Sequence, residues 1–308
     1  MQPKSPASVF EFQRRFSTEE ACERFLVEWR WPHGFVCPRC QGRKAFRLRN
    51  RPLYQCASCR HQTSVTAGTV FHKSKLPLRM WFWAIFLVAR HKKGISALQL
   101  QADLALGSYR TAWLLLHKIR RSFSENEAFP LRGLVEVDET YMGGVEPGAL
   151  HGRAAGAKSI VVAGVEVRDG HMGALRMRVL RDAKKDSLIP FVTENVQRGS
   201  TVATDGWAAY NALEGLGYRR ERNVAYPRRN AQPRPVLLAV HLVFSNLKTW
   251  IRGRFHSVSG KYLPAYLAEF SYRFNRRRSP TDLFGWVTRR LVTHPPRTLR
   301  QIQAEVAA

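Results

Sequence analysis

The first third of the chain contains apolar residues that repeat at the spacing of amphipathic helices. In residues 17–29, STEEACERFLVEW, large or apolar side chains recur every four positions, and Ser17 with Glu20 forms a capping-box pattern. Residues 76–91, LPLRMWFWAIFLVARH, are apolar almost all round, which is typical of a helix buried on every side. The pattern therefore predicts two helices, the second of them within a core.

Residues 94–123, GISALQLQADLALGSYRTAWLLLHKIRRSF, have the pattern of two helices joined by a short turn. Ser96 and Ser108 are suited to cap the two helices, with residues 106–108 forming the turn. The apolar positions expected to pack the helices together are Leu98, Leu104, Ala112 and Leu115. Such a pair is either an ordinary helical hairpin or a helix-turn-helix that contacts DNA. In the second case, the residues near the start of the recognition helix are Tyr109, Arg110 and Thr111.

Beyond residue 130 the pattern changes to Val-rich strands bounded by turn residues. The predicted strands are residues 134–144, 158–170, 173–183 and 200–207, and residues 186–199 suit a helix. Residues 219–235, RRERNVAYPRRNAQPRP, are expected to form a basic loop that contains prolines, and residues 236–293 again have a helical pattern. This order of strands, mixed elements and helices predicts an α/β core.

Two acidic residues fall where these strands are expected to end: Asp138 in VEVDET and Asp205 in TVATDG. Asp at a strand end is commonly a turn residue, because its side chain accepts hydrogen bonds from nearby backbone amides. Two such carboxylates also suit an edge of a sheet where a phosphoryl-transfer enzyme holds two Mg²⁺ ions. Glu136 and Glu139 flank Asp138, so strand alternation decides which carboxylate points into the site.

The charge balance indicates a polyanionic partner. Lys and Arg number 50 against 23 Asp and Glu, a formal net charge of +27, and the sequence pI is near 10.9. The basic residues run the whole length of the chain, which favours nucleic acid over an anionic membrane surface. The chain contains no apolar stretch long enough for a transmembrane helix, and its start lacks the apolar region of a secretory signal. We therefore expect a cytoplasmic protein with no membrane partner.

Five cysteines are present, and four of them form two closely spaced pairs. Cys37 and Cys40 in CPRC, and Cys56 and Cys59 in CASC, have the spacing of a zinc ribbon, in which four thiolates surround one Zn²⁺. An odd number of cysteines in this arrangement suits a reducing compartment better than a disulfide framework. Cys22 stands alone on the predicted helix 17–29 and is expected to pack in the core.

The order of these features resembles a known family. A zinc ribbon, a helix-turn-helix, VDETYMGG, TDGWAAY and the closing block GRFHSVSGKYLPAYLAEFSYRFNRR are together similar to bacterial insertion-sequence transposases with a zinc ribbon and a ribonuclease H-like DDE core. The resemblance covers about residues 20–290. It implies an α/β fold class, with a ribonuclease H-like mixed sheet and helices that follow a small zinc ribbon and a helix-turn-helix segment.

The resemblance also implies a catalytic set. Members carry two Asp residues, a third metal-site residue and a Lys seven positions later on one helix, which fall here on Asp138, Asp205, His241 and Lys248. The third position is His rather than Glu, and similar groups have Asn or His there. The implied cofactors are structural Zn and catalytic Mg or Mn. Of the two catalytic metals, Mn²⁺ suits an imidazole ligand somewhat better than Mg²⁺ does. If His241 is not the third ligand, Glu269 in YLAEF is the next candidate.

The predicted organisation has four parts. These are an N-terminal helix and zinc ribbon (1–74), a helix-turn-helix segment (75–125), a catalytic domain (131–293) and a C-terminal tail (294–308). The implied function is a transposase that binds its terminal inverted repeats on double-stranded DNA and cuts and joins strands. Lys248 and Arg252 would contact DNA. The expected state is a homo-oligomer, a dimer or larger, associated with the bacterial nucleoid.

Two alternatives stay open at this point. The chain is a DNA-binding regulator if the ribbon and the helix pair bind DNA while the α/β half only dimerises. It is an inactive transposase remnant if His241 cannot replace an acidic ligand. The two Asp residues at strand ends argue against a regulator, which has no need for them.

Overall fold

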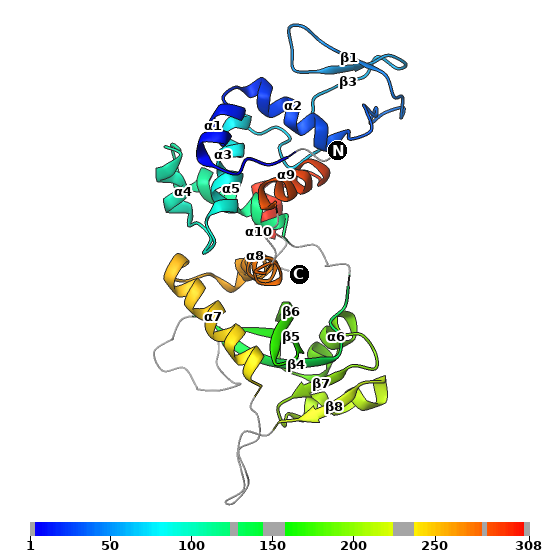
Figure 1. Ribbon diagram of the computed structural model, residues 1–308, viewed down its shortest axis with the longest axis vertical. Coiled ribbons are helices and arrows are strands. Elements are labelled where there is room, and N and C mark those ends of the chain that lie inside the picture. The colour runs from blue at the N-terminus through cyan, green and yellow to red at the C-terminus, as the bar shows by residue number, and fades with distance from the viewer. Residues whose placement is uncertain (1–3, 124–128, 144–157, 224–236, 279–281, 305–308) are drawn as a thin grey trace, which may run out of the picture. The chain divides into compact units, whose positions relative to one another are not determined.

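The computed structural model describes residues 4–123, 129–143, 158–223, 237–278 and 282–304. The chain forms two compact units (Figure 1). The first unit comprises residues 1–123 together with 281–308, and the second comprises residues 124–280. The second unit is therefore inserted, in sequence, between the two segments of the first.

Helices α1 (Val9–Arg15), α2 (Glu19–Arg30), α3 (Leu78–Arg90) and α9 (Leu283–Thr293) form the core of the first unit, and α10 (Leu299–Ala304) follows. The Phe284 ring of α9 packs against aromatic rings of the N-terminal segment, with centroids 5.6 Å from Phe16 and 5.8 Å from Phe82. The predicted division places residues 281–293 in the catalytic domain, whereas the structure places them in the first unit. The physical reason is this burial of Phe284, which is 3% exposed.

Both predicted N-terminal helices are present, with one change of cap. Helix α2 begins one residue later than expected, because the Thr18 hydroxyl rather than Ser17 accepts from the amide of Ala21 at 3.2 Å. Pro77 precedes α3 and offers no side-chain cap. The Glu19 carboxylate instead accepts from the first two amides of α3, at 2.7 and 2.9 Å, and so joins α2 to α3.

The predicted helix pair is α4 (Ala97–Asp103) and α5 (Tyr109–Arg121). The Ser96 and Ser108 hydroxyls cap the two helices as expected. The packing assignment of Leu98 is wrong, because Leu98 is 66% exposed and Leu100 is fully buried in its place. The two side chains lie about 200° apart around the helix, so only one of them faces the core. Leu104, Ala112 and Leu115 are buried as predicted.

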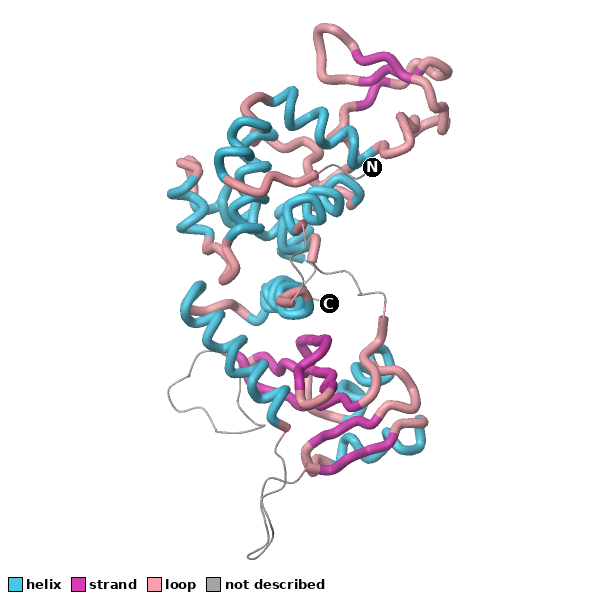
Figure 2. Tube along the Cα trace, viewed as in Figure 1, coloured by secondary structure: helices cyan, strands magenta, loops and turns pink. Residues whose placement is uncertain are grey.

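The zinc-ribbon segment forms a three-stranded antiparallel sheet (Figure 2) of β1 (Ala45–Arg47), β2 (Tyr54–Cys56) and β3 (Gln62–Thr63).

The second unit contains a five-stranded mixed sheet in the order β6-β5-β4-β7-β8 (Figure 1). Strands β4 (Leu134–Met142), β5 (Ser159–Arg168) and β6 (His171–Leu180) are antiparallel neighbours. Strands β7 (Thr201–Thr204) and β8 (Arg219–Arg222) run parallel to β4. This mixed sheet with helices confirms the predicted α/β fold class.

Two hydrophobic cores cover the two faces of this sheet. Helix α6 (Lys185–Asn195) and the 3₁₀ helix η1 (Ala208–Leu216) pack on one face, with Ile160 and Val162 of β5. Helices α7 (Leu238–Phe255) and α8 (Leu263–Asn275) pack on the other, with Val161 and Val165, and η2 (Gly260–Tyr262) joins them. Strand β5 is an almost continuous apolar run because both of its faces are buried.

Two sequence-based expectations about this sheet are wrong. Asp138 does not end its strand, since β4 continues through Met142. Residues 219–222, expected as a loop, form the edge strand β8. Residues 224–236, which include the rest of the predicted loop, lie outside the described residues. By contrast, β7 ends at Thr204, so Asp205 directly follows a strand as predicted.

Candidate active site and metal centre

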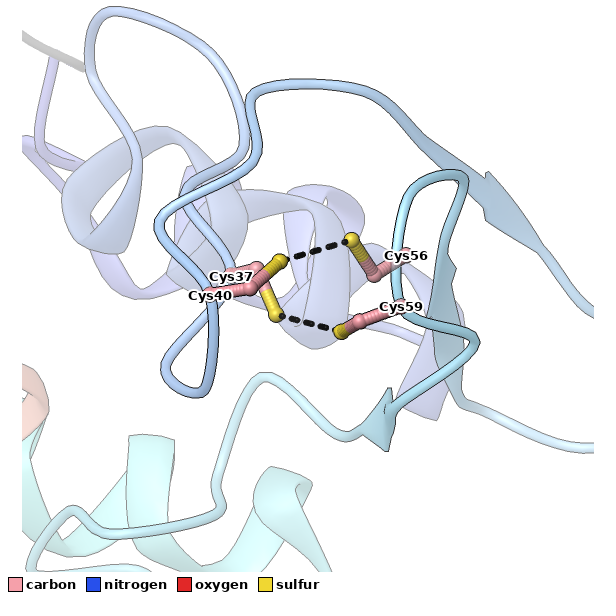
Figure 3. Close-up of side chains that lie close together, drawn as sticks. All are labelled: Cys37, Cys40, Cys56 and Cys59. Carbon is pink, nitrogen blue, oxygen red and sulfur yellow. Dashed lines mark hydrogen bonds between the residues drawn. The ribbon is translucent and has the colours of Figure 1, made fainter.

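The four paired cysteines of the first unit converge on one point (Figure 3). The sulfur atoms of Cys37 and Cys59 are 3.6 Å apart, as are those of Cys40 and Cys56, and all four lie within 4.8 Å of one another. Zn–S bonds of about 2.3 Å in a tetrahedron require sulfurs roughly 3.8 Å apart. The arrangement therefore fits one tetrahedral Zn²⁺.

Each cysteine pair sits on the same kind of backbone turn. The amide of Cys37 donates to the Gly42 carbonyl, and that of Cys56 donates to the His61 carbonyl, both at 2.9 Å. A Cβ atom on Gly42 would lie 3.2 Å from the Cys56 sulfur, so glycine allows the first turn to approach the second pair. The Cys59 amide is the main cause that lowers the pKa of the Cys56 thiol to about 6, which favours the thiolate that binds metal.

The second unit places Asp138 on β4 and Asp205 directly after the neighbouring strand β7. Glu136 of β4 pairs with Ala203 of the parallel strand β7. Asp138 lies two residues beyond Glu136 on β4, and Asp205 lies two residues beyond Ala203, directly after β7 ends at Thr204. Burial is the main cause that raises the pKa of Asp138, and the charge of Asp205 adds to this rise, as expected for close carboxylates.

His241 lies in the first turns of α7 and contacts the first of these aspartates. Its Nε2 atom is 2.9 Å from Oδ2 of Asp138. The Asp138 side chain is 15% exposed and the His241 side chain is 50% exposed, so His241 is the partner that is more accessible to solvent. Against the effect of burial, the Glu139 backbone and His241 lower the pKa of Asp138, because both stabilise the charged carboxylate.

Strand alternation separates the two glutamates that flank Asp138. Glu136 lies on the same face of β4 as Asp138, and its Oε2 atom accepts from the amide of Val240 in α7 at 3.0 Å. Glu139 lies on the opposite face, where its Oε2 atom accepts from the hydroxyl of Tyr210 at 2.9 Å. Both glutamates thus hold structural contacts on either side of the site.

Asp205 does take part in a turn. Its Oδ1 atom accepts from the amide of Trp207 at 2.9 Å, and the Trp207 indole donates to the Ala183 carbonyl at 2.9 Å. We call residues 204–211 the Asp205 turn. The turn therefore uses the Oδ1 atom of the same carboxylate that is predicted from the sequence to bind the metal.

The remaining predicted residues are distributed over both units. Lys248 and Arg252 lie on α7 and are exposed, and burial followed by the charge of Arg252 lowers the pKa of Lys248. In the first unit, Tyr109 is 50% exposed and Arg110 is exposed at the start of α5, with Thr111 half-buried.

Among the described residues, the four cysteines form the only group of three or more metal-ligating side chains with all ligand atoms within 4.8 Å.

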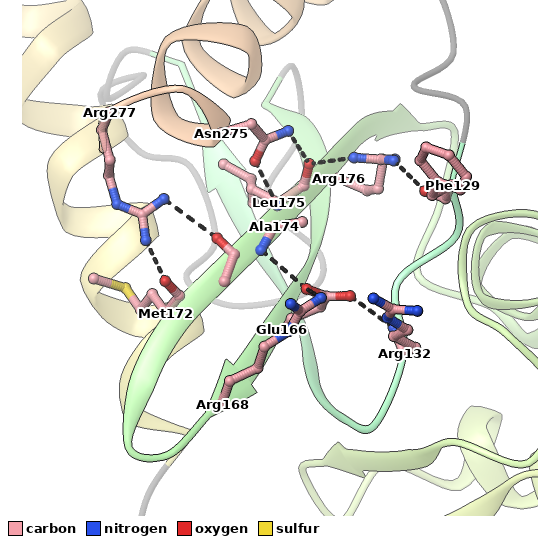
Figure 4. Close-up of polar contacts among 11 residues, drawn as sticks. Phe129, Arg132, Glu166, Arg168, Met172, Ala174, Leu175, Arg176, Asn275 and Arg277 are labelled. Carbon is pink, nitrogen blue, oxygen red and sulfur yellow. Dashed lines mark hydrogen bonds and ion pairs between the residues drawn. The ribbon is translucent and has the colours of Figure 1, made fainter. Parts of the chain in front are cut away.

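The closing sequence block has a structural role in the fold. The Asn275 side chain both donates to and accepts from the backbone of Leu175 on the edge strand β6 (Figure 4), at 3.0 and 2.7 Å. Arg277 donates to the carbonyls of Met172 and Gly173 on the same strand. These contacts satisfy backbone groups that would otherwise leave β6 open to another strand.

Glu269, the alternative third ligand, also belongs to this block. It lies on α8, is 2% exposed and forms an ion pair with Arg273 at 2.8 Å. This buried ion pair already engages the Glu269 carboxylate, whereas the His241 ring contacts Asp138 directly. Of the two candidates, His241 is the one that contacts Asp138.

The two units carry the two domains of a DDE-class transposase with a ribonuclease H-like core and a zinc ribbon. Residues 130–275 match the ISXO2-like transposase domain, and residues 17–62 match the transposase zinc-ribbon domain. The chain belongs to the IS1595 family of transposases that these two domains define. It is also 24% identical, over 215 residues, to an uncharacterized protein in transposable element ISH50 of Halobacterium salinarum. That alignment covers 65% of this chain and 72% of the relative.

None of the helices in the described parts of the chain is long and apolar enough to cross a membrane.

Proposed function

We propose that this transposase binds the terminal inverted repeats of its insertion sequence and catalyses metal-dependent cleavage and transfer of DNA strands. One observation carries the proposal: His241 contacts Asp138 of β4 at 2.9 Å, and Asp205, which directly follows the neighbouring strand β7, is close enough for its charge to raise the pKa of Asp138. A DNA-binding regulator has no use for this arrangement.

Asp138, Asp205 and His241 are the proposed ligands of the catalytic metal. Two carboxylates and an imidazole are a donor set suited to Mg²⁺ or Mn²⁺, and the Asp138 side chain is only 15% exposed. When bound, the metal would supply activation of the attacking oxygen and stabilisation of the leaving oxygen. Cys37, Cys40, Cys56 and Cys59 are the proposed ligands of a structural Zn²⁺.

The surrounding residues would orient this site and the DNA. Glu136 holds the first turn of α7 through the amide of Val240, and thereby sets the position of the adjacent His241. Lys248 lies seven residues further along α7, about 10.5 Å along the axis, where its ammonium group would contact a phosphate. Arg252, one turn beyond Lys248, would extend this contact along the same DNA strand.

The helix pair α4 and α5 is the proposed reader of the transposon ends. Tyr109, Arg110 and Thr111 lie in the first turn of α5, the part of a recognition helix that reaches base edges in a helix-turn-helix. The catalytic unit would add phosphate contacts without base specificity. We propose that the active form is a homo-oligomer, which brings the two ends together.

The proposal is tested with the full-length protein and labelled DNA that carries the element's own ends. We expect cleavage at the ends that requires Mg²⁺ or Mn²⁺, and affinity that falls steeply with salt because phosphate binding releases counterions. The control DNA has the same composition with scrambled ends. Binding of the true ends without any cleavage would instead identify a regulator or an inactive remnant. Residues 1–123 alone are unsuitable for this assay, because α9 belongs to the same unit.

A further inference from the structure

One arginine of the neighbouring edge strand makes four hydrogen bonds to the Asp205 turn. Arg220 lies on β8, and its Nη2 atom donates to the carbonyls of Asp205 at 3.1 Å and Trp207 at 3.0 Å. Its Nε atom donates to the hydroxyl of Thr204 at 3.1 Å, and Nη1 donates to the side-chain carbonyl of Asn211. All four acceptors belong to the Asp205 turn.

These hydrogen bonds satisfy backbone carbonyls that lie just beyond the end of strand β7. Strand β7 ends at Thr204, so the carbonyls of the next residues leave the β ladder and need other donors. The arginine fork carries several N–H groups in one plane and can satisfy acceptors on both sides of the turn at once. A lysine ammonium has its donors on one atom and cannot reach all of these acceptors from one position.

The two other arginines of β8 make fewer contacts with the Asp205 turn than Arg220 does. Arg219 is exposed and contacts the Gly199 carbonyl, at the far end of β7, at 3.4 Å. Arg222 is exposed and makes one long contact with the Asp205 turn, to the Gly206 carbonyl at 3.4 Å. Arg220 is half-buried and has four acceptors, so its side chain is fixed by the turn rather than free for the DNA backbone.

We propose that Arg220 is a positioning residue of the catalytic metal site, which holds the Asp205 turn so that the Asp205 carboxylate stays beside Asp138. The inference rests on the proposed function, because it assumes that these carboxylates bind a divalent metal. Residues that orient metal ligands typically change metal affinity or activity by about 10- to 100-fold when they are replaced. Loss of Arg220 should therefore weaken metal binding without removing a ligand.

The experiment measures Mn²⁺ binding to the full-length protein by electron paramagnetic resonance, and hydrogen exchange of peptides from the Asp205 turn. The variants are Arg220→Gln, which removes the fork and the charge, and Arg220→Lys, which keeps the charge alone. The matched control is Arg219→Gln, one residue away on the same strand. We expect both Arg220 variants to weaken Mn²⁺ binding by about 10-fold or more. We also expect faster exchange in the Asp205 turn, with the control unchanged in both measurements.

Each outcome decides a different claim. Wild-type Mn²⁺ affinity and wild-type exchange in both Arg220 variants would overturn the positioning role. If Arg220→Gln fails to fold, the milder Arg220→Lys variant serves as the test, and wild-type Mn²⁺ binding by it overturns the requirement for the fork. If the wild-type protein itself binds no Mn²⁺, the proposed catalytic site fails, while the exchange measurement still tests whether Arg220 holds the turn.

Discussion

Replacement of Tyr210 by Phe tests how the fold holds the two aspartate-bearing strands. Tyr210 is fully buried, and its hydroxyl donates to the Glu139 carboxylate of β4 at 2.9 Å. Burial, with the charge of Glu139, raises the pKa of Tyr210 well above its usual value, so the hydroxyl stays a donor at neutral pH. A hydrogen bond to a charged group contributes about 1.5–3 kcal/mol, and Tyr210→Phe leaves the buried carboxylate with one donor fewer.

The assay is hydrogen exchange of β4 and β5 peptides in the full-length protein, which reports on the second unit alone. The lost bond predicts exchange roughly 10- to 150-fold faster, where exchange follows the opening equilibrium. The matched control is Tyr218→Phe, whose hydroxyl donates to the uncharged Val196 carbonyl at 3.1 Å. A bond between neutral groups contributes about 0.5–1.5 kcal/mol, or roughly 2- to 12-fold. If Tyr210→Phe accelerates exchange no more than Tyr218→Phe does, the reasoning about the charged acceptor is refuted.

Three further predictions concern the metal sites. Metal analysis should find one tightly held Zn²⁺ per chain. The Cys56→Ser variant should lose this Zn²⁺ and its ribbon should unfold, because zinc binding in such sites supplies folding free energy. Zinc retained by the variant would contradict this. Burial raises the folded-state pKa of Asp138 above its unfolded-state value of 3.8. The contribution of the Asp138 carboxyl to folding stability is therefore fully present below pH 3.8 and is lost as the pH rises through the folded-state pKa. Metal-free Asp138→Asn should therefore melt above the wild type near neutral pH, with the gap closing toward pH 3.8, and a lower melting temperature for the variant would argue against the buried charge. His241→Ala should lose most cleavage activity, whereas His241→Glu should keep some with Mg²⁺; normal activity of His241→Ala would mean that another residue is the third ligand.

The sequence predicts best those features that depend on neighbours along the chain. The zinc ribbon follows from two short C-x-x-C turns, and Ser96 and Ser108 cap helices through amides three residues away. The approach of Asp205 to Asp138 requires more, because the parallel pairing of β4 and β7 brings together two segments that are distant in sequence.

The features that the sequence does not predict depend on tertiary contacts. Residues 219–222, RRER, have no strand-like pattern, and they form β8 only because β7 offers a parallel partner. For the same reason the pattern places Arg220 in a basic loop and does not indicate its contacts with the Asp205 turn. The pattern of α9 predicts a helix but not its partner, and the rings around Phe284 come from the other end of the chain.

The most direct test of the catalytic site is strand cleavage by Asp205→Asn on DNA that carries the element's own ends. The amide keeps the shape of the side chain and the hydrogen bond to Trp207, but it removes the charge that would hold the metal. The control is Asp169→Asn, an exposed turn residue of the same unit. We expect Asp205→Asn to bind the ends normally and to cut neither strand, whereas Asp169→Asn should cut like the wild type. Undiminished cleavage by Asp205→Asn would contradict the assignment of this carboxylate to the metal site.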